Sequence, residues 1–401
     1  MAPHVIESQS VRRRLETRSA CESDVHCPID QRTSPVRKSV AIIGTRGYPS
    51  YYGGFETLLR QLAPYLTNRG WDVTVYGRHG STTPEDPNLD PRVRTIVTKG
   101  IESKSLSTLS YGLTSTAHAF RHAPDVALVM NVANGYWLPA LKAKGIPTVI
   151  NVDGIEWERA KWGRPAKAVF RGGANMTARF GDHLVYDSSE IGRRWANDFG
   201  RDGIYIPYGG TDPGNLNPVD KLSHRSYALM VARFVPENTV AEFLDAAETL
   251  SDRWDVAIVG SSGYGGELDD RVEALATANS RVHWFGHVND DSLLFSLWQH
   301  AGAYFHGHSV GGTNPALVQA MACGAPVIAR DTVFNREVLG PKGQYVAPDP
   351  TAIAAALETV LANSVMQQQL STNSRTRQAE HFTWDVVCGR YEQTLLHASM
   401  Q

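Results

Sequence analysis

The feature that most constrains the fold is a strand, a glycine-containing loop, a helix and a second strand over residues 39–76. Ser39–Ile43 is a short apolar run typical of a buried strand, and the loop from Gly44 to Gly54 follows it. From Phe55 to Leu66 apolar residues recur at helical spacing, and residues 72–76 form the next apolar run. This order predicts a βαβ unit and therefore a parallel sheet.

The same alternation continues and then begins a second time. We expect further strands at 125–130, 147–152, 183–186 and 204–206 and, after a turn-rich stretch at 208–214, at 227–232, 255–259, 281–285, 303–306 and 326–329. Helices are expected at 136–143 and 240–250, and Thr383 is expected to cap a final helix. The sequence predicts an α/β fold of two Rossmann-like, doubly wound domains that face each other across a cleft.

Domain boundaries follow from the turn-rich stretch. We assign residues 38–210 to an N-terminal domain, 211–380 to a C-terminal domain, and 381–401 to a helix that packs back across the junction. Residues 1–37, rich in Arg, Ser and Asp, are expected to be a disordered leader.

Charge and composition exclude several classes of protein. A formal charge of −2 argues against nucleic acid as a partner, because phosphate backbones require a basic surface. The four cysteines, Cys21, Cys27, Cys323 and Cys388, lack zinc-ligand spacing and indicate free thiols in a reducing compartment. No apolar run of about 18 residues is present, and the arginines at 12–14 precede no apolar stretch. A cytoplasmic location is therefore expected.

The most informative candidate site is a glycine turn that leads into a helix. Asn314 is suited to cap this helix, Pro315 fits its first position, and Gly324 suits a left-handed stop. The helix amides would favour a phosphate or sugar hydroxyl in the cleft. A capped helix that only supports the sheet is the alternative. The donor-binding residues expected here are Gly311, Gly312, Thr313, Asn314 and Gln319.

Arg233 and the glycines of the first loop are further candidates. Arg233 follows a predicted strand, where a guanidinium could bind a diphosphate through two hydrogen bonds; a solvated surface arginine is the alternative. Gly53 and Gly54 would allow a ligand to approach the backbone closely. Glu56, in the first helical turn, either belongs to this site or only balances the helix dipole.

Acidic residues follow the predicted strand that ends at residue 152. Asp153 and Glu156 could orient an acceptor hydroxyl or take up its proton, whereas pairing with Arg159 and Lys161 is the structural alternative. A histidine pair at 306 and 308 has no further ligands near it, so neither a metal nor a cofactor is expected. The loop at 44–47 lacks the G-x-G-x-x-G dinucleotide fingerprint, which argues against a dehydrogenase.

Several motifs in order resemble those of the retaining family 4 glycosyltransferases of the GT-B fold, in particular the branch that contains bacterial polysaccharide rhamnosyltransferases. The likeness covers about residues 38–397. The segments that carry it are 43–49, 52–57, 151–154 with Trp157, Arg159, Lys161 and Trp162, 231–238 and 306–315.

The resemblance assigns roles to individual residues. Two family glutamates, which contact the donor sugar and the ribose, correspond to Gly311 and Gln319, and the family's diphosphate-binding Arg and Lys correspond to Arg233 and Asn238. Gln319 departs from the pattern. It could suit a deoxyribose and so a dTDP-sugar, or it could reduce activity. Taken together, Arg233 and Asp153 are the expected catalytic residues, and Arg46, Asp153 and Glu156 are the expected acceptor side.

The implied reaction moves a sugar, with rhamnose from dTDP-rhamnose as one candidate, to a glycan or polyprenyl-linked acceptor with retention at the anomeric carbon. The nucleotide sugar is then a substrate, and peripheral contact with the inner face of the plasma membrane is expected. Two alternatives remain open: a nucleotide-sugar epimerase of the same fold, and a catalytically weakened nucleotide-sugar-binding protein.

Overall fold

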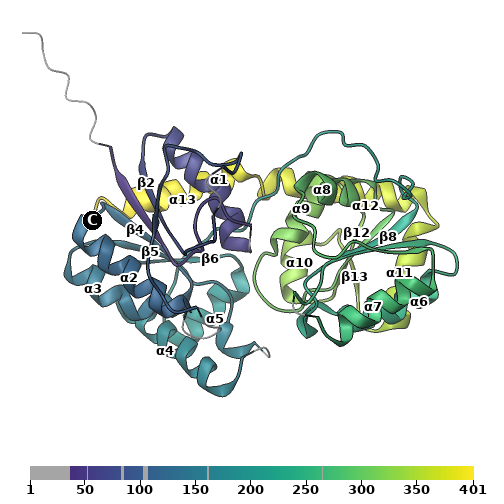
Figure 1. Cartoon of the computed structure of the whole chain (residues 1–401), viewed down its shortest axis with the longest axis horizontal. Coiled ribbons are helices and arrows are strands. Elements are labelled where there is room, and N and C mark those ends of the chain that lie inside the picture. The colour runs from purple at the N-terminus through teal and green to yellow at the C-terminus, as the bar shows by residue number, and fades with distance from the viewer. Residues whose placement is uncertain (1–36, 52, 83–84, 103–106, 160–161, 264) are drawn as a thin grey trace, which may run out of the picture. The chain divides into compact units, whose positions relative to one another are not determined.

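The computed structural model describes residues 37–51, 53–82, 85–102, 107–159, 162–263 and 265–401 (Figure 1). The leader predicted at 1–37 lies outside the described residues except for Arg37. Cys21, Cys27, Tyr52 and Lys161 also lie outside them.

The first domain is built on a seven-stranded parallel sheet with the order β3-β2-β1-β4-β5-β6-β7. Its strands are β1 (Ser39–Ile43), β2 (Asp72–Gly77), β3 (Arg94–Val97), β4 (Val126–Met130), β5 (Thr148–Asn151), β6 (His183–Tyr186) and β7 (Ile204–Tyr205). Its helices are α1 (Gly54–Asn68), α2 (Ser107–His122), α3 (Leu138–Ala143), α4 (Arg164–Phe180) and α5 (Ser189–Phe199), with 3-10 turns η1 (Val132–Trp137) and η2 (Glu156–Glu158).

The second domain has a six-stranded parallel sheet with the order β10-β9-β8-β11-β12-β13. Its strands are β8 (Tyr227–Val231), β9 (Asp255–Val259), β10 (Val282–Trp284), β11 (Ala303–His306), β12 (Val327–Arg330) and β13 (Gln344–Val346). Its helices are α6 (Val240–Leu250), α7 (Glu267–Ala278), α8 (Asp291–His300), α9 (Pro315–Cys323), α10 (Val333–Leu339), α11 (Pro350–Leu361) and α12 (Ser364–His381), with the 3-10 turn η3 (Pro236–Asn238). The chain ends in α13 (Trp384–Ala398).

Each sheet is covered by helices on both faces (Figure 1). Val40 and Ile42 of β1 pack in one core with α1 and α13, whereas Ala41 and Ile43 pack in the opposite core with α2, α3, α4 and α5. This division follows from the alternation of side chains along a strand, and it explains why the buried strands of a doubly wound sheet are apolar on both faces. The predicted α/β fold class of two Rossmann-like domains is confirmed.

The last helix returns to the first domain. Thr383 caps α13, its Oγ1 accepting a hydrogen bond from Val386 N at 3.4 Å. The buried residues of α13 include Val387, Tyr391 and Leu395, which lie in the core that α1 covers. Tyr391 Oη accepts a hydrogen bond from Asn151 Nδ2 at 2.7 Å, so the helix is also tied to the end of β5.

Most predicted elements are found within one or two residues of their expected places, and two kinds of difference stand out. The helix expected at 136–143 is a 3-10 turn, η1, followed by the short helix α3. No bounds were predicted from the sequence for the strands β3 and β13 or for the helices α2, α4, α5, α7, α8, α10, α11 and α12. In α4 the glycine pair at 172–173 argues against a helix, but a Cβ atom at Gly173 would overlap the carbonyl oxygen of Val132. The close packing of α4 on η1 therefore requires glycine there.

Among the residues that the structure describes, no helix is both long enough and apolar enough to cross a membrane. Cys323 and Cys388 are buried free thiols, and burial raises the pKa of each to about 12.

Candidate functional site

The glycine turn and the start of α9 have the local structure that the sequence predicts. Oδ1 of Asn314 accepts a hydrogen bond from Ala316 N at 2.9 Å and caps the helix, and Pro315 occupies its first position. Gly324 ends the helix in the left-handed conformation. Gly311, at φ +103°, is in a backbone conformation that favours glycine. The first amides of α9 therefore follow directly on the turn.

Hydrogen bonds join this turn to Asp187, which follows β6 in the first domain. The backbone carbonyl of Asp187 accepts hydrogen bonds from Thr313 N, at 3.1 Å, and from Thr313 Oγ1. A Cβ atom at Gly312 would overlap Oδ1 and Cγ of Asp187 and would lie 2.6 Å from Oδ2. Gly312 is thus required by the approach of a carboxyl group from the other domain.

Asp187 is a buried carboxyl group whose Oδ1 has no hydrogen-bond partner within the described part of the chain. Burial, and next the nearby Asp153 carboxylate, raise its pKa to about 8, although Arg159 acts in the opposite direction. The side chain therefore keeps its proton at neutral pH. Asp187 was not predicted from the sequence as a site residue. Its only signal there is its position directly after a predicted strand.

Asp153 and Glu156, the predicted acidic cluster, have different surroundings. Asp153 is half-buried at φ +62°, and its Oδ2 accepts a hydrogen bond from Asn131 Nδ2 at 2.9 Å. Glu156 is buried, with Oε1 2.6 Å from Arg159 Nε and Oε2 accepting from Trp162 Nε1 at 2.7 Å. Glu156 is thus paired with Arg159, as in the structural alternative given above. The side chain of Asp153, in contrast, is partly exposed to solvent.

Arg159 brings positive charge to the turn before α9. Its Nη2 atom lies 3.5 Å from the position that a Cβ atom would take at Gly311, and 2.9 Å from that of Gly154. Burial lowers the pKa of Arg159, but the carboxylates of Glu156 and Asp153 outweigh burial and raise it. The guanidinium is therefore firmly charged where the loops of the two domains meet.

Arg233 supplies a second positive charge. Its exposed side chain has no hydrogen bond or ion pair with any described residue, and its carbonyl oxygen accepts from Asn238 Nδ2 at 2.8 Å. Asn238 is buried and shapes the Arg233 loop. Burial, followed by the charges of Arg233 and Arg159, lowers the pKa of His308 to about 3. The positive charges of Arg233 and Arg159 thus both disfavour protonation of His308, which shows that the two guanidinium groups lie near the same side chain.

The rings of His306 and His308 are stacked, with centroids 4.5 Å apart, and His306 Nδ1 is 3.0 Å from the hydroxyl of Tyr304. Burial also lowers the pKa of His306. Across the described residues, no group of three or more His, Cys, Asp or Glu side chains is arranged to hold a metal ion.

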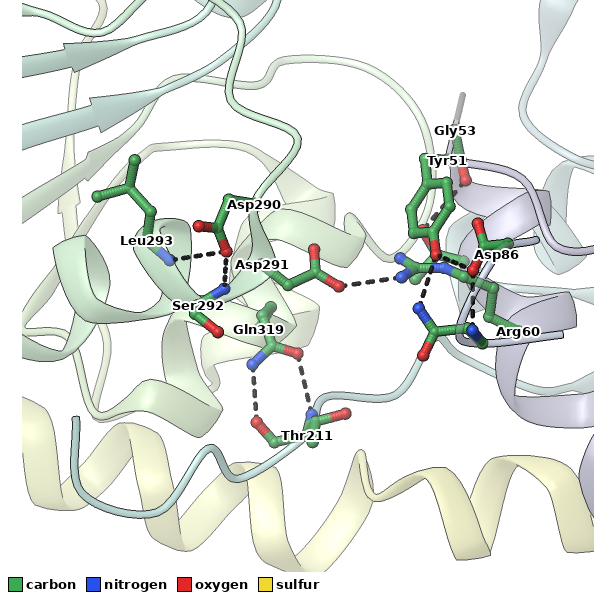
Figure 2. Close-up of polar contacts among 12 residues, drawn as sticks. Tyr51, Gly53, Arg60, Asp86, Thr211, Asp290, Asp291, Ser292, Leu293 and Gln319 are labelled. Carbon is green, nitrogen blue, oxygen red and sulfur yellow. Dashed lines mark hydrogen bonds and ion pairs between the residues drawn. The ribbon is translucent and has the colours of Figure 1, made fainter. Parts of the chain in front are cut away.

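Gln319 faces a different partner from the expected ribose. Its Oε1 accepts from Thr211 N at 2.9 Å, and its Nε2 donates to Thr211 O at 2.7 Å (Figure 2). The side-chain amide thus fixes the segment that joins the two domains. A cavity of about 390 Å³ lies beside this pair, and its lining residues also include Arg60, Asp291 and Trp384.

The first glycine loop is packed rather than open. A Cβ atom at Gly54 would lie 3.0 Å from the Tyr208 hydroxyl and 3.4 Å from Cγ of Pro315, so the start of α1 contacts the start of α9. Gly53 caps α1 with its carbonyl, which accepts from Thr57 N at 3.0 Å. Arg46 N donates to Oε1 of the buried Glu56 at 3.0 Å.

Two further contacts join the domains. Nη1 of Arg60 is 2.9 Å from Oδ2 of Asp291 (Figure 2). The carboxylate of Glu337 on α10 accepts from Ser188 Oγ and Ser189 N, each at 2.7 Å, at the start of α5.

Comparisons with known proteins agree with this architecture. Residues 52–214 match the family described as Glycosyltransferase Family 4, and residues 217–377 match Glycosyl transferases group 1. Sucrose-phosphate synthase from Thermosynechococcus elongatus superposes with a TM-score of 0.73 at 20% identity, covering 89% of this chain and 98% of that one. Anabaena HepE, solved in complex with UDP and glucose, superposes with a TM-score of 0.70 at 17% identity, covering 90% and 99%.

The chain has the two-domain GT-B fold, and each of its two domains matches a glycosyltransferase family. Among its relatives, O-antigen chain mannosyltransferase B of Escherichia coli is 27% identical over 190 residues, covering 45% of this chain and 48% of that protein. Phosphatidyl-myo-inositol mannosyltransferase of Mycobacterium leprae (strain TN) is 28% identical over 213 residues, covering 50% and 56%. MMP alpha-(1->4)-mannosyltransferase of Mycolicibacterium hassiacum is 24% identical, covering 88% and 96%. The aligned region thus spans about half the length of the first two relatives.

The residues predicted for the site form two groups. Around Asp187, Arg159 and His308 the structure gathers residues from both domains, namely Asp153, Arg233, Asn238, Gly311, Gly312, Thr313 and Asn314. Gln319 lines the cavity beside Thr211 instead. The first group, with two guanidinium groups and a helix N-terminus, can bind an anionic leaving group.

Proposed function

We propose that the chain is a glycosyltransferase that moves a hexosyl residue from a nucleoside diphosphate sugar to a glycan or polyprenyl-linked acceptor, with retention. The observation that carries the proposal is the guanidinium of Arg233, which has no partner among the described residues and acts with Arg159 on His308. The turn into α9 begins a few residues beyond His308, so the positive end of this helix lies near both guanidinium groups. An exposed guanidinium without a carboxylate partner is well suited to bind phosphate.

The chemistry follows from this charge distribution. As the glycosidic bond breaks, negative charge grows on the leaving diphosphate, and Arg233 with the positive end of the α9 dipole would stabilise it. Asp153, with part of its carboxylate exposed, would orient the acceptor hydroxyl. In a retaining reaction without a covalent enzyme intermediate, the hydroxyl attacks from the leaving-group side and the donor phosphate takes its proton. Because the side chains and the helix supply positive charge, the proposal requires no metal ion.

The relatives and the motif resemblance favour different transferred sugars. The relatives named above are mannosyltransferases, which favours mannose, whereas the motif resemblance favours rhamnose. Gln319 gives less support to a dTDP-sugar, since both ends of its amide are already hydrogen-bonded to Thr211. We propose mannose as the first sugar to test and rhamnose as the second.

We also propose peripheral membrane contact when the acceptor is polyprenyl-linked. It is supported by α4, which exposes Arg164, Val169 and Arg179, a basic surface with an apolar side chain. Cosedimentation with vesicles of anionic lipid should depend on these arginines. Equal binding by the Arg164→Glu, Arg179→Glu double variant would contradict this part of the proposal.

The main test measures release of nucleoside diphosphate from GDP-, UDP- and dTDP-linked sugars, with and without glycan and polyprenyl phosphate acceptors. We expect acceptor-dependent release from one nucleotide class, and a product with the same anomeric configuration as the donor by NMR. Arg233→Gln should abolish most of the release, whereas Arg121→Gln, at an exposed position of α2, should not. Donor conversion without any acceptor would instead indicate an epimerase, and binding without turnover a binding protein.

A further inference from the structure

The first domain holds a buried arginine that lacks an anionic partner. Arg78 follows β2 and is 7% exposed. Its Nε is buried without a hydrogen-bond partner, and its guanidinium makes no ion pair or hydrogen bond with any described side chain. The guanidinium carbon lies over the face of Tyr111, 5.1 Å from the ring centroid. A buried charge without a partner is costly, so such a group is retained where a ligand supplies the opposite charge.

A second guanidinium group lies next to it. The carbonyl of Arg46 accepts from Arg78 N at 2.8 Å, which places the two residues side by side on adjoining loops. Burial, and then the like charge of Arg46, lower the pKa of Arg78. The carboxylates of Glu102 and Glu56 oppose this shift without cancelling it, and neither forms an ion pair with Arg78. These two carboxylates therefore do not compensate for the burial of Arg78 and its repulsion from Arg46.

We propose that Arg78 and Arg46 form a phosphate-binding subsite in the first domain and that the acceptor carries a phosphate group bound there. The planar forks of two guanidinium groups match the oxygens of a phosphate, and a dianion would relieve both the burial of Arg78 and its repulsion from Arg46. This inference rests on the proposed transfer reaction, for which it names the class of acceptor.

The position of the pair favours the acceptor as the source of the phosphate. Arg78 and Arg46 lie beyond the carboxyl ends of β2 and β1, in the first sheet. The candidate for the donor diphosphate, Arg233 with the α9 amides, belongs to the second sheet. Asp153, which would orient the acceptor hydroxyl, follows β5 at the same edge of the first sheet as Arg78.

Inorganic phosphate is the probe, because it needs neither a known acceptor nor turnover. Its effect on the thermal midpoint would be measured at constant ionic strength for the whole chain and for Arg78→Gln, Arg233→Gln and Arg94→Gln. Arg94 is an exposed arginine on the neighbouring strand β3 and serves as the matched control. We expect saturable stabilisation by phosphate in the wild type, Arg94→Gln and Arg233→Gln, and none in Arg78→Gln.

The outcomes separate the two sources. Stabilisation that is lost in Arg233→Gln and kept in Arg78→Gln would place phosphate at the donor site only and overturn the proposal. So would an absence of stabilisation in the wild type. None of these results depends on activity, so failure of the proposed transfer reaction would be recognised separately by the nucleotide-release assay.

The thermal midpoint without phosphate distinguishes ligand binding by Arg78 from a purely structural role. A structural role predicts that replacing Arg78 lowers this midpoint. Since the buried charge has no partner without ligand, Arg78→Gln should have the same or a higher thermal midpoint than the wild type in phosphate-free buffer. If Arg78→Gln does not fold, Arg78→Lys keeps the charge but loses the fork, and its affinity for phosphate should fall by about tenfold. Unchanged affinity in that variant would overturn the proposal.

Discussion

Replacing Gly312 by alanine tests the contact on which the candidate site depends. Gly312 has no positive φ, so its backbone accepts alanine without strain. The added methyl group would nevertheless overlap Oδ1 and Cγ of Asp187 and approach Oδ2 to 2.6 Å. The substitution therefore acts through this one steric contact between the domains.

The size of the effect follows from the overlap. Forcing one extra methyl group into a well-packed place costs about 1–3 kcal/mol. Because the overlap is relieved when the turn moves away from Asp187, this cost opposes the closed arrangement of the site. We expect kcat/KM for sugar transfer to fall by roughly 5- to 150-fold, the factor that corresponds to that range of free energy.

A double-mutant cycle provides the control. Asp187→Ala removes the three atoms that the new methyl group meets, so Gly312→Ala should cost much less in that background than in the wild type. Gly163→Ala is the matched substitution without an overlap, since its Cβ would have no neighbour closer than 3.9 Å at φ −71°. Full activity of Gly312→Ala, or an equal loss in both backgrounds, would refute the reasoning.

Three further predictions concern charge and hydrogen bonding. The pKa of Asp187, raised to about 8, lies above its unfolded value of 3.8, so the folded state binds the extra proton and stability falls as pH rises from about 4 to 8. Asp187→Asn should flatten this slope in urea midpoints; an unchanged slope would refute the assignment. Arg233→Lys should lower kcat by about 10²-fold through loss of the fork, with little change in thermal stability. Equal kcat would argue against phosphate binding by Arg233. Gln319→Glu should lower the free energy of unfolding by about 1–2 kcal/mol, since a carboxylate would face the Thr211 carbonyl. Stability equal to the wild type would show that this pair contributes little.

The parts of the fold that were predicted are those specified by neighbouring residues. α9 begins after Asn314 and ends before Gly324 as expected, because caps act within one turn of chain. β1, β6, β9 and β11 have the predicted bounds, since runs of apolar residues bounded by polar ones mark strands buried on both faces.

The parts that were missed depend on contacts between distant residues. α4 carries glycines that a helix normally avoids, and only the approach of Val132 explains Gly173. Asp187 was missed because its role arises from the turn at Gly312, which no pattern in either segment shows. The bonds of Gln319 to Thr211 were not predicted either, because they depend on the path of the connecting segment; the assignment of Gln319 to a ribose stays a prediction.

The packing of α13 in the first domain has a consequence for synthesis. The N-terminal sheet is complete once residue 205 has been made, yet Val387, Tyr391 and Leu395 fill its core only after the rest of the chain has left the ribosome. At ordinary rates of translation that interval is roughly 10–40 s. During this interval the apolar face of α1 that packs against α13 is exposed to solvent. A truncated first domain should therefore aggregate when expressed alone, and a fused copy of α13 should restore its solubility.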